Sequence, residues 1–533
     1  METVTITKAE YEDFLALKAE MLASKEHAAR LERQVEYLLE QMRLSRHRQF
    51  GASSEKSEYD SEQLNLFNEA EVMAAPELPE PELVEVEKHY RKRTRLTTDK
   101  LPEDLPVEVI EYTLPEDEQV CGCGCGLHVM GHETRRELKI IPAQAVIVEH
   151  RRAVYSCRNC DKTDIKVPIR KAEMPKPVIS GSFASPEAIA HVVAQKFVMG
   201  IPLYRQEQEW KRQGIALSRQ TMSNWLLRCA KDWLAPIYER MKALLLEHEV
   251  LHADETTLQV LQEPGKTAQS KSYMWLYRTS GDAKYPIVLY EYQPNRKAEH
   301  PERFLGSWCG YLHADGYEGY HRLPEGITVV GCWSHLRRKF DEALKIVAKD
   351  DRKSSLASVG KGYCDRLFEL EREFAELSPQ QRYEKRLEAS KPLMEEFFAW
   401  ADSCGAVPKS LVGKAVYYSQ SQRKYLEGFL RDGRLEISNN RAERSIKPFV
   451  IGRKNFLFCN TPRGADGSAI LYSIVETAKE NGLDSYRYLA MLLRELPNCP
   501  EENWTEFLPG GCQVPESCRC PMPKKSGYAW EDD

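Results

Sequence analysis

The tripeptide His-Ala-Asp occurs twice in the chain, and each copy ends in an acidic residue that could take part in catalysis. The first copy ends at Asp254 in "VLHADETTLQV", and the second ends at Asp315 in "YLHADGYEGY". A short apolar run precedes each aspartate, which is the pattern of a strand that delivers a carboxylate to a sheet edge. Two carboxylates held side by side can bind hard divalent cations through oxygen. The alternative is that each aspartate is an ordinary solvated charge.

A metal site of this kind normally needs a third acid from a later helix, and the best candidate is Glu443. It lies in "LEISNNRAERSIKPFVIGRKNFLF", one turn into a predicted helix that Ser438 or Asn439 could cap. Basic residues flank it on both sides. A lone glutamate on a helix is usually solvated, but three acids at these places in the chain favour a shared site.

The segments that carry the two aspartates are predicted to be strands of one sheet. After Glu247 the chain changes to short β-rich runs, "VLHADETTLQV", "SYMWLYRTS" and "YPIVLYEYQ". A helical stretch, the strand "GYLHADGY" and the strand "ITVVGCWSH" follow, so the predicted order is β-β-β-α-β-α-β. In the ribonuclease-H-like fold the first and fourth strands are neighbours. That fold would therefore place Asp254 and Asp315 opposite each other.

An all-helical insertion is predicted at about 336–433, between the last strand and the helix of Glu443. Its sequence is charged and helical, as in "SHLRRKFDEALKIVAKD". The motif "CWSH" at its start places Cys332 and His335 three apart. This pair could be half a metal site, but we expect it to orient the insertion or to reach the edge of the active site.

The region from Ser185 to Leu234 has the pattern of a helix-turn-helix. Ser185 and Ser218 are candidate N-caps, and Gly200 and Gly214 separate the predicted helices. The third helix would expose polar side chains suited to reading DNA: Arg219, Gln220 and Asn224. A helical hairpin without any role in DNA binding is the commoner alternative.

A cysteine-rich segment predicts a small zinc-ribbon-like β-domain. Cys157 and Cys160 form a C-x-x-C pair, which can share one tetrahedral zinc ion. The other half-site is irregular, because Cys121 and Cys123 in "CGCGCG" are only two apart. We expect one structural zinc; a metal-free knuckle or chance cysteines are the alternatives. The C-terminal cysteines in "GCQVPESCRCPMP" are interpreted as part of a frayed tail.

A heptad seam begins the chain and predicts a coiled coil that joins two protomers. Its members are Phe14, Leu17, Met21, Ser24, Ala28, Leu31, Val35, Leu38 and Met42. The alternative is a helix that packs on its own chain. An acidic, proline-rich linker at 69–87 and the basic run "YRKRTR" follow.

Length and composition agree with a soluble multidomain protein. The chain has 533 residues, so several domains are expected. It has neither a signal-peptide pattern nor a membrane-spanning apolar run, which predicts a cytoplasmic protein without membrane contact. A net charge of −6 gives no overall nucleic-acid signature, so DNA binding must come from local charge. The fold class is multidomain α+β, with expected domains at 1–50, 51–100, 101–175, 176–245, 246–480 and 481–533.

Together these motifs resemble the DDE transposases of bacterial insertion sequences, specifically insertion-sequence family sixty-six. The resemblance rests on Asp254, on "HADGYEGY" with Asp315, on "CWSHLRRKF", and on "NNRAERSIKPFVIGRKNFLF" with Glu443. The heptads followed by "QFGASSEKSE", the segment ending "YSCRNC", the helices "LYRQEQEWKRQGIALSRQTMSNWL" and the terminal "NWTEFLP" extend it over nearly the whole chain. The chain departs from the family at the Cys121–Cys123 region, where the usual C-x-x-C is shortened.

The resemblance implies a specific chemistry. Asp254, Asp315 and Glu443 would hold two Mg²⁺ or Mn²⁺ ions about 3.5–4 Å apart for in-line attack of water or a DNA 3′-hydroxyl on phosphorus. Basic residues after Glu443 would contact DNA phosphates: Arg444, Lys447, Arg453 and Lys454. The helix-turn-helix and the cysteine segment would recognise the element's terminal inverted repeats. A homodimer or higher oligomer, accessory proteins of the element and a place at the nucleoid are also implied.

Two other functions remain as alternatives. A DNA-binding regulator descended from such an enzyme would keep the fold and lose the chemistry. A ribonuclease-H-like nuclease acting on RNA–DNA hybrids would explain the acids but would leave the heptads, the cysteine segment and the helix-turn-helix without a use.

Overall fold

The computed structural model divides the chain into two compact units, one formed by 1–54 with 175–520 and the other by 55–174 with 521–533. The structure describes residues 14–15, 17–18, 20–22, 24–25, 35, 38–39, 42, 145–155, 170–348 and 350–521. The described residues between Phe14 and Met42 are helical and exposed, which agrees with the predicted helix. The coiled coil itself stays a prediction. No described helix is long and apolar enough to cross a membrane.

The second unit contains a short hairpin. Strand β1 (Val154–Tyr155) pairs antiparallel with β2 (Arg170–Lys171). The predicted zinc ligands Cys121, Cys123, Cys157 and Cys160 lie outside the described residues.

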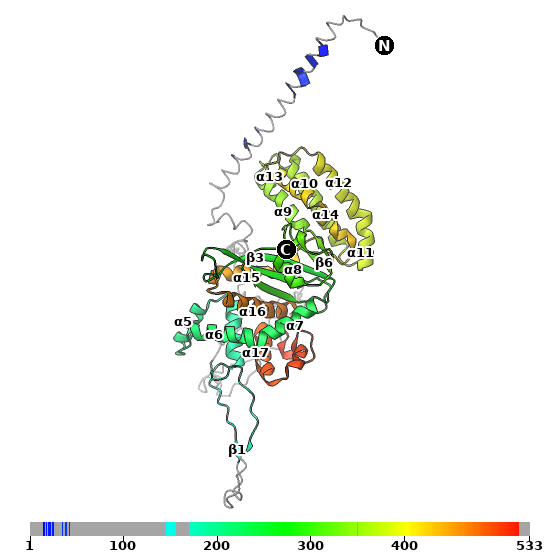
Figure 1. Ribbon diagram of the computed structural model, residues 1–533. Coiled ribbons are helices and arrows are strands. Elements are labelled where there is room, and N and C mark those ends of the chain that lie inside the picture. The colour runs from blue at the N-terminus through cyan, green and yellow to red at the C-terminus, as the bar shows by residue number, and fades with distance from the viewer. Residues whose placement is uncertain are drawn as a thin grey trace, which may run out of the picture. The chain divides into compact units, whose positions relative to one another are not determined.

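A five-stranded mixed sheet forms the centre of the first unit (Figure 1). Its strands are β3 (Val250–Gln259), β4 (Lys271–Thr279), β5 (Val288–Gln293), β6 (Gly310–His313) and β7 (Ile327–Val330), in the order β5-β4-β3-β6-β7. The pairs β3–β4 and β4–β5 are antiparallel, whereas β3–β6 and β6–β7 are parallel. The first and fourth strands are therefore neighbours, as predicted. The short helix α8 (Glu299–Leu305) connects β5 to β6.

The connection between β6 and β7 differs from the predicted order, which had a helix there. The structure has one 3-10 turn, Tyr320–Arg322. The physical reason is the short span between the strands, which also contains Gly316, Gly319 and Pro324 and leaves little room for a helix.

Three helices follow the insertion and complete the unit: α15 (Asn440–Phe456), α16 (Pro462–Glu480) and α17 (Ser485–Glu495). Helix α15 packs on β3 and β4, and α16 packs along β5. The edge of β5 is satisfied by side chains of α16, because Thr477 Oγ1 and Ser473 Oγ accept the backbone N–H groups of Val288 and Tyr290 at 3.0 and 2.8 Å. Such bonds close an edge that would otherwise pair with another strand.

The helical region before the sheet confirms the predicted caps. Ser185 caps α4 (Pro186–Val193), and Ser218 caps α6 (Arg219–Cys229). Helix α5 (Leu203–Arg212) lies between them in the chain, and α7 (Ala235–Leu245) leads to the sheet. Gly200 and Gly214 end the preceding helices with φ of +69° and +77°, a conformation that favours glycine.

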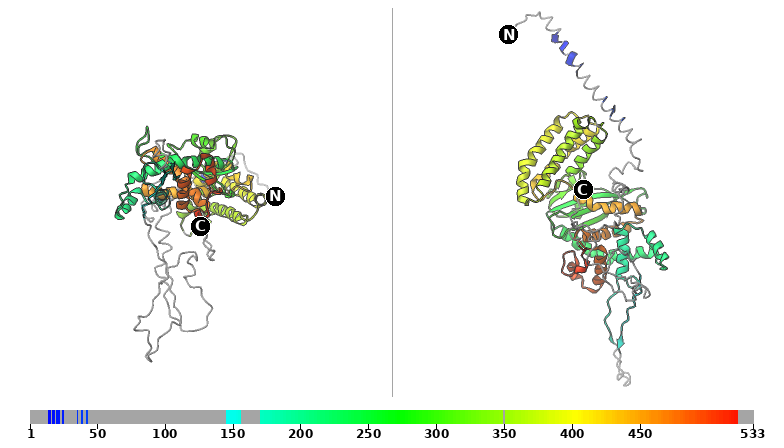
Figure 2. Two further views of the ribbon diagram at one scale, coloured as in Figure 1. Left: turned by 90° about the horizontal axis from the view of Figure 1, so that it is seen from below. Right: turned by 180° about the vertical axis from the view of Figure 1, so that it is seen from behind.

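The insertion is an all-helical bundle with its own apolar core. Its helices are α9 (Trp333–Lys345), α10 (Leu356–Glu373), α11 (Pro379–Lys385), α12 (Lys391–Ser403), α13 (Leu411–Ser421) and α14 (Arg423–Leu426). Figure 1 shows the bundle on one side of the sheet and α16, α7 and α17 on the other. The view from behind in Figure 2 gives the same order. The bundle begins within three residues of the predicted start.

Arg386 is a buried anchor of this bundle, with 1% of its side chain exposed. Its guanidinium donates to both carboxylate oxygens of Glu371 at 2.8 and 2.6 Å. It also donates to the carbonyls of Phe429, Asp432 and Leu435 at 2.8–3.1 Å. These three carbonyls belong to the segment that leads into α15. Arg386 therefore stabilises both the helical bundle and the chain segment that precedes the helix of Glu443.

Replacing Arg386 by methionine should destabilise the insertion by about 3–5 kcal/mol, because Glu371 would remain buried without its partner. Hydrogen exchange of insertion peptides in urea would measure this. The matched control is Arg423→Met, since Arg423 pairs with Glu427 at the surface and should contribute about 1 kcal/mol or less. Equal losses in the two variants would contradict the anchoring role of Arg386.

Candidate active site

The two His-Ala-Asp tripeptides lie side by side on parallel strands. His252 of β3 is the register partner of His313 of β6. Asp254 and Asp315 each follow their histidine by two residues, and Asp315 is near enough to act on the charge of Asp254. The imidazole rings of His252 and His313 stack with centroids 4.3 Å apart, and Ala253 and Ala314, which follow them, are fully buried. The repeated tripeptide thus has a structural meaning, because each copy supplies a buried histidine and a buried alanine followed by an acid.

The paired histidines are neutral, and each ring makes a hydrogen bond to the segment that leads into α15. Burial lowers the pKa of His252 to about 3 and lowers that of His313 well below its ordinary value. The Nε2 atom of His313 accepts the backbone N–H of Glu436 at 3.2 Å. Sequence reasoning did not assign either histidine a role, although its place next to a candidate acid was a usable signal.

Asn439 connects the strand of Asp254 to the helix of Glu443. It is the N-cap residue of α15, as predicted, but its side chain makes no capping bond. Instead Nδ2 donates to the carbonyl of Ala253 at 2.8 Å, and Oδ1 accepts from Nδ1 of His252 at 3.0 Å. Its backbone N–H donates to Sγ of Cys332 at 3.1 Å. With 1% of its surface exposed, Asn439 is the point where β3, α9 and α15 meet.

Negative charge accumulates around Asp254. Burial, together with Glu255, Asp315 and Glu443, raises the pKa of Asp254 well above its ordinary value. Burial and Asp315 likewise raise the pKa of Glu255 to about 7. Arg296 partly compensates, since its Nε donates to Glu255 at 2.6 Å and its Nη2 lies 3.7 Å from Asp315. Sequence reasoning missed both Glu255 and Arg296.

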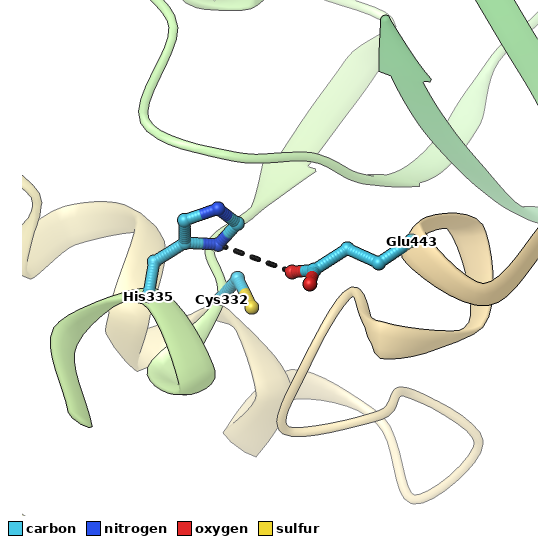
Figure 3. Close-up of side chains that lie close together, drawn as sticks. All are labelled: Cys332, His335 and Glu443. Atoms are coloured by element: carbon cyan, nitrogen blue, oxygen red, sulfur yellow. Dashed lines mark ion pairs between the residues drawn. The ribbon is translucent and has the colours of Figure 1, made fainter. Parts of the chain in front are cut away.

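Glu443 lies one turn into α15 and faces the start of α9 (Figure 3). Its Oε2 accepts from Arg338 at 2.9 Å, and its Oε1 lies 3.5 Å from Nδ1 of His335. Burial disfavours the charge of His335, but Cys332, Glu443 and Asp315 outweigh it and raise the pKa of His335 to about 10. The "CWSH" motif therefore reaches the site through both of its chemically active residues.

The carboxylates of Asp254 and Asp315 fit hard divalent cations, which prefer oxygen ligands. Neighbouring carboxylates disfavour each other's negative charge, and a bound cation would relieve this repulsion. Glu443 Oε1 is buried and has no hydrogen-bond partner in the structure, so a lone pair is available. Within the part of the chain that is described, one group of three ligand atoms lies within 4.8 Å, formed by Cys332, His335 and Glu443. Glu443 therefore has close partners on α9, in Arg338 and His335.

The predicted DNA contacts fall into two places. Arg219, Gln220 and Asn224 are all exposed on α6. On α15, Arg444, Lys447 and Lys454 are exposed, whereas the guanidinium of Arg453 bonds to the carbonyl and hydroxyl of Thr257. Arg453 therefore ties α15 to β3.

Comparison with known proteins gives consistent matches along the chain. Residues 181–467 match the model described as the transposase IS66 family. Residues 37–110 match "Transposase C of IS166 homeodomain", 118–161 match the zinc-finger binding domain of transposase IS66, and 473–509 match the IS66 C-terminal element.

Two relatives match about three quarters of the chain. An uncharacterized protein of Sinorhizobium fredii, y4qI, is 32% identical over 411 residues, covering 73% of this chain and 72% of that protein. A second, y4jD, is 31% identical over 412 residues, covering 74% and 78%. With the domain matches in the same order, the chain belongs to the IS66 family of transposases.

Proposed function

We propose that the protein binds the terminal inverted repeats of its insertion sequence and catalyses metal-dependent cleavage and transfer of DNA strands. The observation that supports this proposal best is the pairing of His252 with His313, because each histidine is followed two residues later by an acid, and Asp315 and Glu443 both act on the charge of Asp254. The raised pKa of Asp254 supports it, because acids crowded in this way are typical of functional sites.

Each acid has a separate part in this proposal. Asp254 and Asp315 present oxygens from a rigid sheet, and Glu443 supplies a third carboxylate from α15. Mg²⁺ or Mn²⁺ bound there would activate the attacking hydroxyl and stabilise the leaving oxygen. Arg296 limits the repulsion between Glu255 and Asp315 and so keeps the strand ends together. The buried histidines fix the two strands next to these acids.

DNA would be held by surfaces outside the acid cluster. Arg444 and Lys447 are exposed on the helix of Glu443 and are suited to phosphate contacts that position DNA. The exposed residues of α6 and the cysteine segment with one structural zinc would recognise the element ends. The heptad helix would join two protomers so that both ends are handled together, with accessory proteins of the element as further partners.

Asp254→Asn should reduce strand transfer by about 10³-fold or more, because metal-assisted charge stabilisation contributes several kcal/mol. The assay is joining of a pre-cut, labelled element end to a plasmid in Mg²⁺ or Mn²⁺. The control is Asp341→Asn on α9, since Asp341 pairs with Lys345 at the surface. If wild-type protein binds the ends but joins nothing, even with the element's other proteins, the inactive DNA-binding regulator becomes the better account.

Asn439→Ala should slow strand transfer by about 10²-fold while end binding stays unchanged, because a small shift of α15 misplaces Glu443. The Mg²⁺ concentration for half-maximal rate should also rise. Asn481→Ala is the matched control, since the side chain of Asn481 also makes two hydrogen bonds, to the carbonyls of Pro286 and Thr477, but near none of the three acids in the chain. A similar loss of stability in both variants without any change in Mg²⁺ requirement would argue against positioning by Asn439.

Lys447→Ala should weaken binding to all DNA sequences about equally and lower the salt slope of binding by about one unit, as expected for one lost phosphate contact. Fluorescence anisotropy at several salt concentrations would measure it. Lys345→Ala provides a control on the insertion, where the lysine already pairs with Asp341. An unchanged slope for Lys447→Ala would remove this residue from the DNA-binding surface.

A further inference from the structure

We propose that Cys332, His335 and Glu443 form a second metal site, which takes a thiophilic divalent cation such as Zn²⁺ and thereby holds Glu443 away from Asp254 and Asp315. The inhibitory part of this inference rests on the proposed function, whereas the metal binding itself does not. The three side chains point toward one another in Figure 3.

The start of α9 brings two of the ligands together. Cys332 is the N-cap of the helix, and His335 lies three residues later on the same turn. Arg338, one turn further, also faces Glu443 and bonds to its Oε2. Residues three apart on a helix share one face, and the contact of His335 with Glu443 shows that this face is turned toward α15.

The distances suit a small tetrahedral site. The three ligand atoms all lie within 4.8 Å of one another, and Nδ1 of His335 is 3.5 Å from Oε1 of Glu443. Metal–ligand bonds of about 2.0–2.3 Å in a tetrahedron place ligand atoms roughly 3.3–3.8 Å apart. Only a small movement of the thiol or the carboxylate is needed to complete the site.

The ligand atoms are also available for coordination. Nδ1 of His335 and Oε1 of Glu443 are both buried, and neither has a hydrogen-bond partner among the described residues, so a metal ion that displaces the proton of His335 would meet both atoms. Sγ of Cys332 accepts the N–H of Asn439 at the N-terminus of α9, which holds the sulfur near the other two ligand atoms. Arg338 holds the other oxygen of Glu443, as outer partners of metal ligands commonly do.

The chemistry of the ligands selects the cation. A set of sulfur, nitrogen and oxygen prefers Zn²⁺, whereas Mg²⁺ prefers oxygen alone. Three protein ligands leave a fourth position for water. Because Glu443 belongs to both sites, its carboxylate cannot serve α9 and the aspartates at once. Zn²⁺ should therefore compete with Mg²⁺-supported strand transfer.

Cobalt binding to the full chain tests the site directly. Wild type and Cys332→Ser are titrated with Co²⁺ side by side, and the difference in sulfur-to-cobalt charge-transfer absorption is recorded, so that cobalt bound to other cysteines cancels. Cys332→Ser should lose part of the wild-type band, and His335→Gln and Glu443→Gln should weaken Co²⁺ binding by that part at least tenfold. Cys332→Ser keeps an acceptor for the N–H of Asn439, so folding should be retained. Cys309→Ser is the matched control, because Cys309 is an exposed thiol elsewhere in the sheet domain.

The two proposals fail in different ways. A wild-type titration that matches Cys332→Ser would overturn the second metal site, even if Mg²⁺-dependent strand transfer is normal. A Co²⁺ band that depends on Cys332 in a protein without strand transfer would keep the site and remove the proposed activity.

Inhibition is measured on wild type and on Cys332→Ser side by side. Micromolar Zn²⁺ should lower wild-type strand transfer in Mg²⁺ at least tenfold and leave Cys332→Ser several-fold less sensitive. Equal inhibition of both proteins would show that Zn²⁺ acts elsewhere and would overturn the inhibitory role.

Discussion

The side chain of Asn439 is the constraint on which the rest of the site depends. It spends both of its polar atoms on β3, at His252 and Ala253, rather than on capping its own helix. Because this amide is buried, losing either bond would leave a polar group without a partner, which costs about 1–3 kcal/mol. The start of α15 is therefore held in one position along β3, and this also sets the position of Glu443 one turn later.

Repulsion between the acids is balanced by positively charged side chains, and these differ between the sheet and the helix α9. Arg296 stands beside Glu255 and Asp315, while Arg338 and His335 stand beside Glu443. Glu443 therefore has charge-compensating partners of its own on α9. In the proposed second site, a thiophilic cation would bind Glu443 on this side.

The sequence predicted more of the frame than of the detail. The strands, the two helix caps and the helical insertion followed from local patterns, which act over a few residues, whereas the pairing of the first and fourth strands was expected from the ribonuclease-H-like fold. The role of Asn439 could not be predicted, because its partners lie 186 and 187 positions away. Arg453 was expected at DNA phosphate and bonds to Thr257 instead, since sequence alone does not say which side of α15 faces the sheet. The roles of Glu255 and Arg296 likewise depend on register and burial.

The bonds between β5 and α16 have a consequence for synthesis on the ribosome. The backbone N–H of Val288 has no bond to Thr477 until that residue, 189 positions later in the chain, has been synthesised. At about 5–20 residues per second, the strand edge stays open for roughly ten to forty seconds of translation. Glu443 also emerges long after Asp254. A nascent chain therefore carries the aspartates before the glutamate, and the proposed acid site can form only after α15 has been synthesised.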